Sequence, residues 1–288
     1  MSIIFKKVNH IYAPNTPFEH LALNEIDLEL VDGKMCAIIG HTGSGKSTLV
    51  QHMNALLLPS AGEVQIDDFV VKKEKNKGLK QLRKKVGLVF QFPEYQLFED
   101  TIEKDICFGP KNFGVSEEEC KKIAKEVIKL VGLDESLLSC SPFELSGGQK
   151  RRVAIAGILA MNPDVLVLDE PTAGLDPSGA KEMLNLFVKL NKQGKTILIV
   201  THEMDYVLEY ADECIVLKEG KLEFQGTPSS LFSNQELLNK VELEVPSVFD
   251  FALKLNKKGF NLDLSKIKDV NSLSKEIASS LKGGSDYE

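Results

Sequence analysis

The stretch GHTGSGKS at residues 40–47 decides the fold of this 288-residue chain. It fits the pattern G-x-x-x-x-G-K-[ST] and lies between an apolar run, Met35–Ile39, and a predicted helix, Lys46–Leu57. Glycines let successive backbone N–H groups converge on phosphate oxygens, and a helix N-terminus favours negative charge. The stretch therefore predicts a phosphate-binding loop between a buried strand and a helix, within an α/β fold.

The residues of this loop are expected to contact different parts of a nucleotide. Lys46 reaches the β- and γ-phosphates, Ser47 offers its hydroxyl to Mg²⁺, and Thr48 meets an α-phosphate oxygen. The sequence thus predicts ATP and Mg²⁺ as ligands. The predicted nucleotide-binding residues of the loop are Gly40, His41, Thr42, Gly43, Ser44, Gly45, Lys46, Ser47 and Thr48.

Two acids follow a second buried strand, in the stretch VLVLDE at residues 165–170. The carboxyl ends of strands are where open α/β sheets present their sites. Asp169 suits Mg²⁺, and Glu170 suits a general base that polarises water. An ordinary strand end before Pro171 is the alternative, and the phosphate loop favours the functional interpretation.

A second anion-binding helix end is predicted at LSGGQ, residues 145–149. Ser146 and Gln149 can form a capping box at the start of a helix over Lys150–Met161. Its glycines and exposed N–H groups favour an anion. One chain thus carries two phosphate-binding helix ends, which do not both fit one nucleotide in one monomer.

This LSGGQ stretch resembles the signature sequence of ABC ATPases. The resemblance implies an α/β P-loop NTPase with a RecA-like core, a helical subdomain at about residues 92–160 and a small C-terminal helical domain. It places the ATP-binding domain at residues 1–235 and a C-terminal extension, with dimerisation as its candidate role, at 236–288. It also implies a head-to-tail dimer. In that dimer each signature helix caps the partner's ATP through Ser146, Gly147, Gly148 and Gln149.

Four further positions resemble the family pattern. Gln91 matches the Q-loop glutamine, a contact to Mg²⁺ and water, and Asp176 matches the D-loop residue that touches the partner. His202 matches the switch histidine that contacts the γ-phosphate. Tyr12 matches the aromatic residue that stacks on adenine, with a core position as the alternative. The resemblance therefore assigns catalysis to Glu170, His202 and Gln91, and the metal to Ser47, Gln91 and Asp169.

The stretches FQFPEYQLF at 90–98 and FGPKNFG at 108–114 narrow the resemblance to the ATPases of energy-coupling-factor (ECF) transporters, the CbiO-like group. Within that group the chain is most similar to the second of two paralogous ATPases. The resemblance implies a second ATPase subunit, paralogous or identical, and a membrane T component that docks through coupling helices. A separate S component selects a vitamin or transition metal ion. Glu94 is then expected to pair with an arginine of the T component, or to be a solvated acid.

Composition limits the other classes of function. The net charge is −7, which argues against a nucleic-acid partner because such binding depends on neutralising phosphates. The longest apolar run, Val153–Met161, is too short to span a bilayer, so the chain would serve a membrane from outside the lipid. The resemblance then implies a peripheral place on the cytoplasmic face of the cell membrane. Soluble ABC ATPases of DNA repair or translation usually carry insertions that are not visible here. A conventional importer or exporter ATPase stays open.

Hydrophobic patterns predict the remaining elements. Helical patterns between several strands predict a mostly parallel sheet covered on both faces, and Ser116 with Glu119 predicts a capping box at the start of a helix. Apolar residues over 243–253 can pack between two ATPase subunits or on their own domain, and both stay open. The predicted strands are Ile3–Val8, Ile26–Leu30, Met35–Ile39, Glu63–Asp67, Val86–Phe90, Val165–Asp169, Thr196–Val200, Glu213–Leu217 and Leu222–Gln225.

Overall fold

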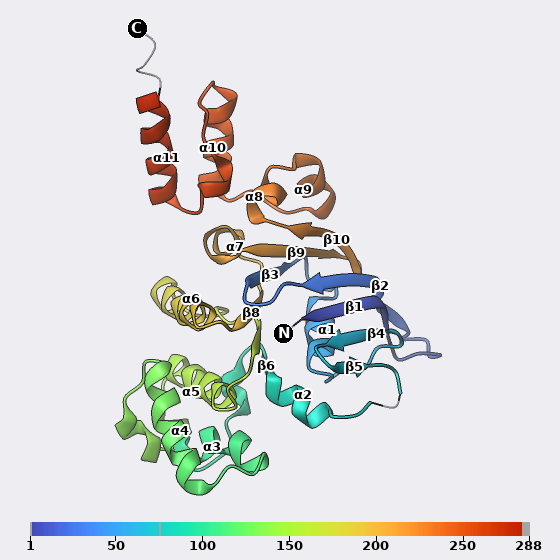
Figure 1. Cartoon of the computed structure of the whole chain (residues 1–288), viewed down its shortest axis with the longest axis vertical. Coiled ribbons are helices and arrows are strands. Elements are labelled where there is room, and N and C mark those ends of the chain that lie inside the picture. Colours follow the sequence, from blue (N-terminus) through green and yellow to red (C-terminus); the bar gives the residue numbers. More distant parts are fainter. Residues whose placement is uncertain (1, 75, 284–288) are drawn as a thin grey trace.

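The computed structural model describes residues 2–74 and 76–283, and its larger sheet has six strands (Figure 1). These are β3 (Met35–Ile39), β6 (Val86–Val89), β7 (Val165–Asp169), β8 (Thr196–Val200), β9 (Glu213–Lys218) and β10 (Lys221–Gly226). Their order is β10-β9-β3-β8-β7-β6, and the neighbours are parallel except β10 with β9. The predicted mostly parallel sheet is confirmed.

A second sheet, fully antiparallel, lies beside the first. Its strands are β1 (Ile3–Tyr12), β2 (His20–Leu30), β4 (Ala61–Ile66) and β5 (Phe69–Val71), in the order β2-β1-β4-β5. Hydrophobic patterns predicted three of these strands but no separate sheet. Alternating hydrophobicity shows that one face of a strand is buried, but it does not identify the neighbouring strand.

Helix α1 (Lys46–Met53) packs between the two sheets. Its residues Leu49 and Met53 share one hydrophobic cluster with Phe5 of β1 and Val167 of β7. Helices α5 (Gly147–Leu159) and α6 (Pro177–Lys192) cover the other face of the parallel sheet, where Leu166 belongs to a second cluster. Successive residues of β7 thus face opposite layers, as the pleat of a strand requires. The site described below lies where α1 and β7 meet.

The helix after the phosphate loop is shorter than predicted. It was expected to reach Leu57 but ends at Met53, and Ala55 adopts a left-handed φ of 53°. The backbone N–H groups of Leu56 and Leu57 both donate to the carbonyl of Gln51. The apolar pattern continues past this turn although Leu56 is 47% exposed, and the prediction followed the pattern rather than the turn.

A group of helices lies between β6 and β7, at one end of the molecule (Figure 1, green). Ser116 caps α4 by accepting from the N–H of Glu119 at 3.3 Å, which is one half of the predicted capping box; the reciprocal bond to the Glu119 side chain is not found among the described residues. Besides α5, the group contains η1 (Pro93–Gln96), α3 (Ile102–Asn112), α4 (Glu117–Leu130), η2 (Glu135–Ser139) and η3 (Pro142–Glu144). Helix α2 (Leu79–Lys85) precedes β6.

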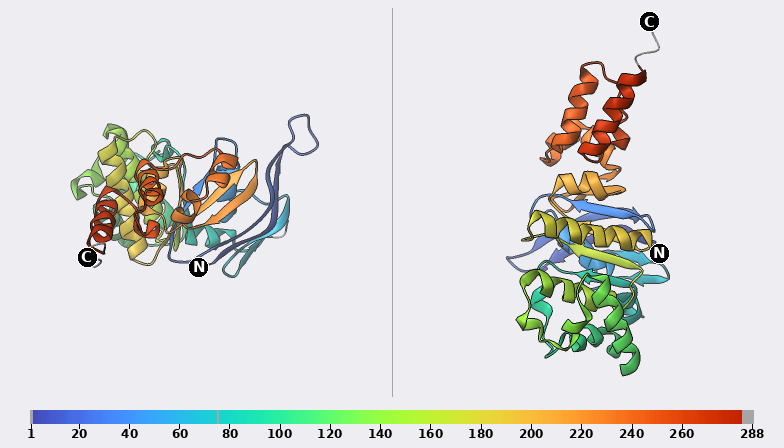
Figure 2. Two further views of the ribbon diagram at one scale, coloured as in Figure 1. Left: turned by 90° about the horizontal axis from the view of Figure 1, so that it is seen from above. Right: turned by 90° about the vertical axis from the view of Figure 1, so that its left-hand side faces the viewer.

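The C-terminal helices lie at the opposite end of the molecule (Figures 1 and 2). Phe249 packs against Phe232 and belongs to a third cluster with Ile39 and Val216, whereas Phe251 is 52% exposed. One face of this segment therefore packs on its own chain, and the other is free. The division of the chain at residue 235 stays a prediction, and residues 284–288 lie outside the described part. The C-terminal elements are α8 (Pro228–Phe232), α9 (Gln235–Val241), α10 (Ser247–Lys257), η4 (Leu264–Lys266) and α11 (Val270–Gly283), whereas α7 (Met204–Tyr210) lies between β8 and β9 along the chain.

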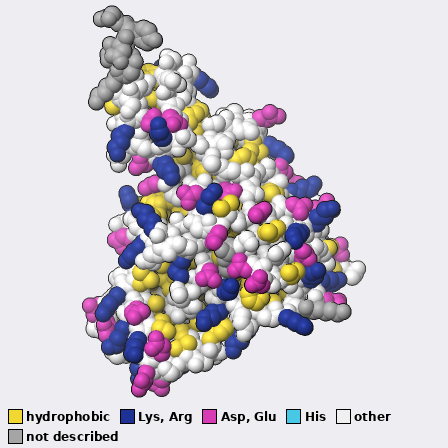
Figure 3. Space-filling model, viewed as in Figure 1, with side chains coloured by type: hydrophobic (Ala, Val, Ile, Leu, Met, Phe, Trp, Pro, Cys, Tyr) yellow, Lys and Arg dark blue, Asp and Glu magenta, His cyan; other side chains and the backbone are white. Residues whose placement is uncertain are grey.

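Charged side chains of both signs are interspersed over the face seen in Figure 3. Several form local pairs, such as Lys104 with Asp100 at 3.2 Å. Exposed pairs of this kind contribute little stability. Within residues 2–74 and 76–283, no helix is both long enough and apolar enough to cross a bilayer.

Candidate nucleotide-binding site

The loop between β3 and α1 adopts a conformation that only glycine accommodates at two positions. Gly40 has a φ of 148°, and a Cβ there would lie 2.2 Å from the carbonyl oxygen of Leu217. Gly45 has a φ of 101°, and its Cβ would lie 2.6 Å from the carbonyl oxygen of Ala22. Both clashes are with backbone, which cannot move aside as a side chain can. The chain's own packing therefore requires these two glycines.

Polar groups that suit an anion lie inside this loop. Lys46 is buried, and its Nζ donates to the carbonyls of Gly40 at 2.6 Å and His41 at 2.8 Å. Burial lowers the pKa of Lys46, although the carboxylates of Glu170 and Asp169 act in the opposite direction. The hydroxyl of Ser44 is buried and has no hydrogen-bond partner among the described residues. A bound phosphate would supply acceptors for both groups.

The residues predicted to hold Mg²⁺ converge beside α1. Burial raises the pKa of Asp169 and the nearby Ser47 side chain opposes that rise, and both residues line the same cavity. A hydroxyl and a carboxylate are oxygen donors, and Mg²⁺ typically takes one or two protein oxygens together with water and phosphate. The donors present therefore fit the ion.

Glu170 is the centre of a second group of contacts. The Nε2 of Gln91 donates to one carboxylate oxygen at 2.8 Å, and the Nδ1 of His202 lies 3.4 Å from the other. Glu170 itself has a left-handed φ of 49°, which is uncommon for a residue with a side chain. Such strain persists where surrounding contacts hold the residue in place, and it is frequent at active sites.

Two neighbouring cavities bring most of the predicted site residues together. The first cavity has a volume of about 510 Å³. It is lined by Tyr12, Gly43, Gly45, Ser47, Thr48, Gln91, Asp169 and Glu170. A second of about 530 Å³ adds His202, Gly40 and His41, and Thr42, Lys46 and Glu170 line both. Tyr12, at the end of β1, is 39% exposed. The structure thus assembles residues from β1, β3, β6, β7 and β8 in one place.

The side chain of His41 points away from the phosphate loop. Its Nε2 lies 3.1 Å from the carbonyl oxygen of Val241 and 3.0 Å from that of Glu242. Only the backbone of His41 therefore faces the loop interior, and its ring contacts the segment that leads to α10. The expectation that His41 binds nucleotide stays open for its backbone alone.

The signature residues lie away from both cavities, at the start of α5. The predicted capping box is present: Ser146 accepts from the N–H of Gln149 at 3.4 Å, and Gln149 accepts from that of Ser146 at 3.0 Å. A Cβ added at Gly147 or Gly148 would have no described atom within 4 Å. Asp176 caps α6 by accepting from the N–H of Gly179 at 2.9 Å.

Glu94 is paired within the chain, which differs from both alternatives considered for it. Arg151 of α5 donates to its two carboxylate oxygens at 3.1 Å and 2.9 Å, and both side chains are largely buried. Burial alone would raise the pKa of Glu94, but the hydrogen bonds from Arg151 and a backbone amide outweigh it and lower the pKa. Both oxygens are therefore engaged without an arginine from a partner.

Arg151 is the residue that sequence reasoning missed. Its Nη1 also donates to the carbonyls of Pro171 at 3.3 Å and Ala173 at 2.6 Å, and its guanidinium lies over the Phe92 ring. It thus connects α5 with η1 and with the loop after Glu170. Its position as the second residue of the predicted helix Lys150–Met161 is a weak signal, because an arginine there is usually solvated.

A phosphate loop on a mostly parallel sheet, with a second glycine-rich helix end on the same chain, is the arrangement of the ABC class of ATPases. The ABC transporter family model matches residues 23–173. The ECF transporter ATP-binding protein EcfA2 of Enterococcus faecalis is 58% identical over 91% of this chain and 92% of its own length. The protein of the same name from Bacillus thuringiensis is 51% identical over 99% of this chain and 98% of its own length.

Solved structures agree with these relatives. The structure of cbiO1 from Clostridium perfringens, part of the ABC transporter complex cbiONQ, is 40% identical with a TM-score of 0.72. It covers 87% of this chain and 98% of that one. A dimeric ATP-binding cassette in a post-hydrolysis state, bound to ADP and Pi, is 33% identical with a TM-score of 0.70. The match covers 78% of this chain and 98% of the cassette.

The chain belongs to the ABC transporter family and, within it, to the ATP-binding subunits of ECF transporters. It binds nucleotide and is an ATP-hydrolysing transporter subunit. The resemblance to the second paralogous ATPase is confirmed, and a conventional importer or exporter ATPase is no longer an alternative.

Proposed function

We propose that this chain is one of two ATPase subunits that power an ECF-type importer of vitamins or transition metal ions. The observation that carries the proposal is the start of α5. The helix end is capped, yet open space surrounds Gly147 and Gly148, and no described residue of the chain brings a phosphate-binding group opposite it. This helix end suits the nucleotide of a second ATPase subunit, identical or paralogous.

In the proposed dimer each ATP lies between the phosphate loop of one subunit and the signature helix of the other. Tyr12 stacks on the base, and the loop backbone with Lys46 holds the phosphates. The partner contributes Ser146, Gly147, Gly148 and Gln149, whose helix end favours the γ-phosphate charge. The dimeric cassette with bound ADP and Pi supports this arrangement by similarity.

Hydrolysis transfers the γ-phosphoryl group to water. Glu170 accepts a proton from the attacking water, while Gln91 and His202 hold the carboxylate and contact the γ-phosphate. Ser47, Asp169 and Gln91 would hold Mg²⁺, which when bound offsets the charge of the phosphates. Loss of the γ-phosphate removes charge from the interface, so the dimer opens.

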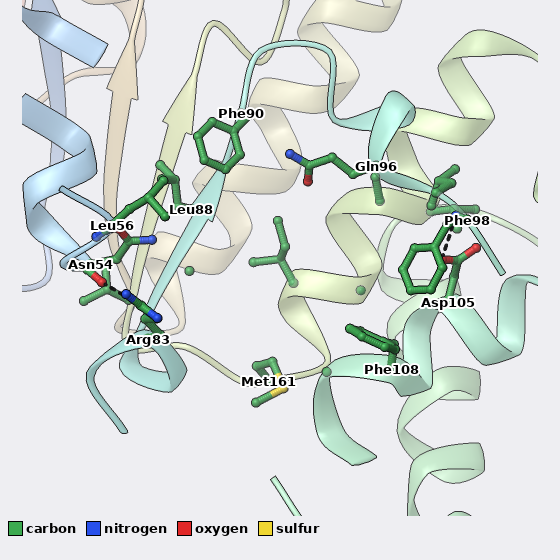
Figure 4. A pocket seen from close by; sticks show the side chains of 18 residues that line it. Asn54, Leu56, Arg83, Leu88, Phe90, Gln96, Phe98, Asp105, Phe108 and Met161 are labelled. Carbon is green, nitrogen blue, oxygen red and sulfur yellow. Dashed lines mark hydrogen bonds between the residues drawn. The ribbon is translucent and has the colours of Figure 1, made fainter. Parts of the chain in front are cut away.

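A groove between the parallel sheet and the helices before α5 is the proposed docking site for the membrane T component (Figure 4). It has a volume of about 440 Å³, and Phe90, Phe98, Phe108 and Met161 line it. Phe98 and Phe108 meet edge to face with ring centroids 5.0 Å apart, and both are about half exposed. An apolar groove of this size suits a helix laid into it.

The groove lies against the helical segment of residues 92–160, which carries the signature helix α5. Arg151 connects this segment to the loop after Glu170, so rigid-body motion of residues 92–160 can pass from the ATP site to a docked coupling helix. The chain then works as a peripheral subunit on the cytoplasmic face of the cell membrane. The S component selects the cargo and meets this chain only indirectly.

The exposed face of α10 and α11 is the proposed additional contact between the two ATPase subunits. Phe251 and Val270 line a shallow apolar depression there and are 52% and 67% exposed. Such a contact would keep the two subunits associated after the ATP-bound interface has opened. Deleting residues after 240 and measuring dimerisation without nucleotide tests this role.

Replacing an aromatic residue in the groove tests the transporter function. Phe108→Asp should leave ATP binding intact but prevent co-purification with the membrane components, because a charge would enter an apolar docking site. Phe18→Asp is the matched control, since Phe18 is 84% exposed on the loop between β1 and β2, away from the groove. Undiminished assembly and transport with Phe108→Asp would overturn the docking site.

A further inference from the structure

Two buried histidines lie behind Tyr12. His10 of β1 meets the Tyr12 ring edge to face, with centroids 4.5 Å apart, and meets the ring of His52 at 4.8 Å. His10 is 7% exposed and His52 of α1 is completely buried. The three rings thus form one column that runs from the surface of the nucleotide cavity into the core between the sheets.

Hydrogen bonds to carbonyl groups fix the state of both histidines. The Nδ1 of His10 lies 3.2 Å from the carbonyl oxygen of Leu58, and that of His52 lies 2.7 Å from the carbonyl oxygen of Thr48. A carbonyl only accepts, so each Nδ1 carries a proton. Burial lowers the pKa of both residues, that of His52 to about 4, and a lowered pKa favours the neutral ring.

This arrangement is not the one that core stability alone would favour. The Nε2 of His52 is buried and makes no hydrogen bond of ordinary geometry among the described residues, although the ring also lies near the backbone of Leu58. An unsatisfied buried polar atom costs stability, and an apolar side chain of similar size would avoid the cost. What the histidine adds is its Nδ1–H on the carbonyl of Thr48, one residue after Ser47.

Thr48 also contacts Tyr12 directly. The Tyr12 hydroxyl lies 3.1 Å from the Oγ1 of Thr48. A phosphate oxygen only accepts hydrogen bonds, so a Thr48 hydroxyl that contacts the α-phosphate must donate to it. The Tyr12 hydroxyl then donates to Thr48. The ring of Tyr12 is therefore held by the His10 ring and its hydroxyl by Thr48, while Tyr12 also lines the cavity.

We propose that His10 and His52 are positioning residues for ATP, which hold the Tyr12 ring and the Thr48 hydroxyl in one fixed relation. The platform for the base and the contact to the α-phosphate then form a single preorganised unit. The Tyr12 hydroxyl has a role separate from its ring, because it orients the Thr48 hydroxyl toward the phosphate. This inference rests on the proposed placement of the base against Tyr12.

A pair of substitutions at His10 separates positioning from packing. His10→Asn keeps a donor near the position of Nδ1 for Leu58 but removes the ring beside Tyr12. His10→Phe keeps a ring and removes the donor. We expect His10→Asn to weaken ATP binding about three- to tenfold, as the loss of one modest contact would, and His10→Phe to restore most of it.

Tripolyphosphate, which lacks the base and ribose, is the second probe. His10→Asn should change its Kd much less than that of ATP, because the ring of Tyr12 does not touch it. Tyr12→Phe keeps the ring, so it should weaken both ligands by a similar factor through Thr48. Binding is measured by calorimetry on the full-length chain, with thermal unfolding of each variant as the check on folding.

Three outcomes decide the matter. A raised ratio of the two dissociation constants for His10→Asn, restored by His10→Phe, supports the positioning role. Equal losses for both ligands in His10→Asn, or a lower melting temperature with unchanged binding, would overturn it. If the unsubstituted chain failed to bind ATP at all, the proposed ATPase site would fail instead.

Discussion

Two glycine-rich turns open helices in this chain, and they differ in what requires their glycines. At the start of α1, a side chain on Gly40 or Gly45 would collide with the backbone of the same chain. At the start of α5, a side chain on Gly147 or Gly148 would meet no described atom within 4 Å. Glycine near a helix start brings little stability of its own. The glycines of α5 are therefore best explained by a molecule that approaches from outside.

The two helix ends also differ in their surroundings. The end of α1 is enclosed by Lys46, Asp169 and Glu170 of the same chain, whereas that of α5 is finished only by its capping box. One is a nearly complete site and the other is half of one. The difference teaches that the structure of a single subunit already shows which surface needs a partner.

The largest expected effect is on the chemistry of the α1 end. Glu170→Gln keeps the size of the side chain but removes the proton acceptor, so hydrolysis should fall by about two to four orders of magnitude. ATP binding should persist, and both are measurable on the purified transporter. Glu203→Gln is the matched control, because Glu203 lies 3.5 Å from the other nitrogen of His202. Undiminished turnover in Glu170→Gln would remove Glu170 from its assigned role.

Arg151 is the internal support of the α5 end, and its loss should destabilise the protein. Arg151→Ala leaves Glu94 as a buried, unpaired charge, which costs about 3–5 kcal/mol of unfolding free energy. The neighbouring substitution Arg152→Ala breaks a pair with Glu182, whose side chain is 64% exposed, and a hydrogen bond to the Val131 carbonyl, and should cost less, about 1–2 kcal/mol. Chemical denaturation measures both. Equal losses of unfolding free energy in the two variants would show that the buried Glu94–Arg151 pair contributes no more than the Arg152–Glu182 pair.

The two glycine turns can be compared directly with alanine substitutions. Gly40→Ala should cost about 3 kcal/mol and distort the phosphate loop, because the new Cβ overlaps a backbone carbonyl. Gly147→Ala should leave stability unchanged or raise it by up to about 1 kcal/mol. Its hydrolysis should nonetheless fall about tenfold, since a methyl group would stand between the helix end and the partner's ATP. Normal hydrolysis by a stable Gly147→Ala protein would contradict the half-site interpretation.

Acidification should affect the α1 end more than the α5 end. His52 has an ordinary pKa of 6.5 and a folded pKa of about 4, so the unfolded chain binds a proton between these values that the folded chain does not. Stability is complete above pH 6.5 and falls as the pH drops, by about 2 kcal/mol from pH 7.5 to pH 5. Burial shifts His10 in the same direction. His52→Leu should flatten this pH dependence, and thermal unfolding across the range would reveal an unchanged slope if the histidine were not responsible.

Local sequence was enough for the parts of the site that consecutive residues build. The phosphate loop, the Asp169–Glu170 pair and the signature cap are short segments whose chemistry depends on neighbouring residues and on backbone N–H groups. Their positions could therefore be predicted, and the parallel strands around them followed from apolar runs. The capping box of Ser146 and Gln149 was found as predicted for the same reason.

What the sequence determined is thus the class of ATPase, its two phosphate-binding helix ends and the strands that carry its carboxylates. Only the tertiary structure decided that β1, β2, β4 and β5 form a separate sheet, that Glu94 pairs with Arg151, and that His10 and His52 stand behind Tyr12. These contacts join residues from distant parts of the chain. Strand pairing and buried polar contacts of this kind depend on how whole elements pack, which periodicity and short motifs do not specify.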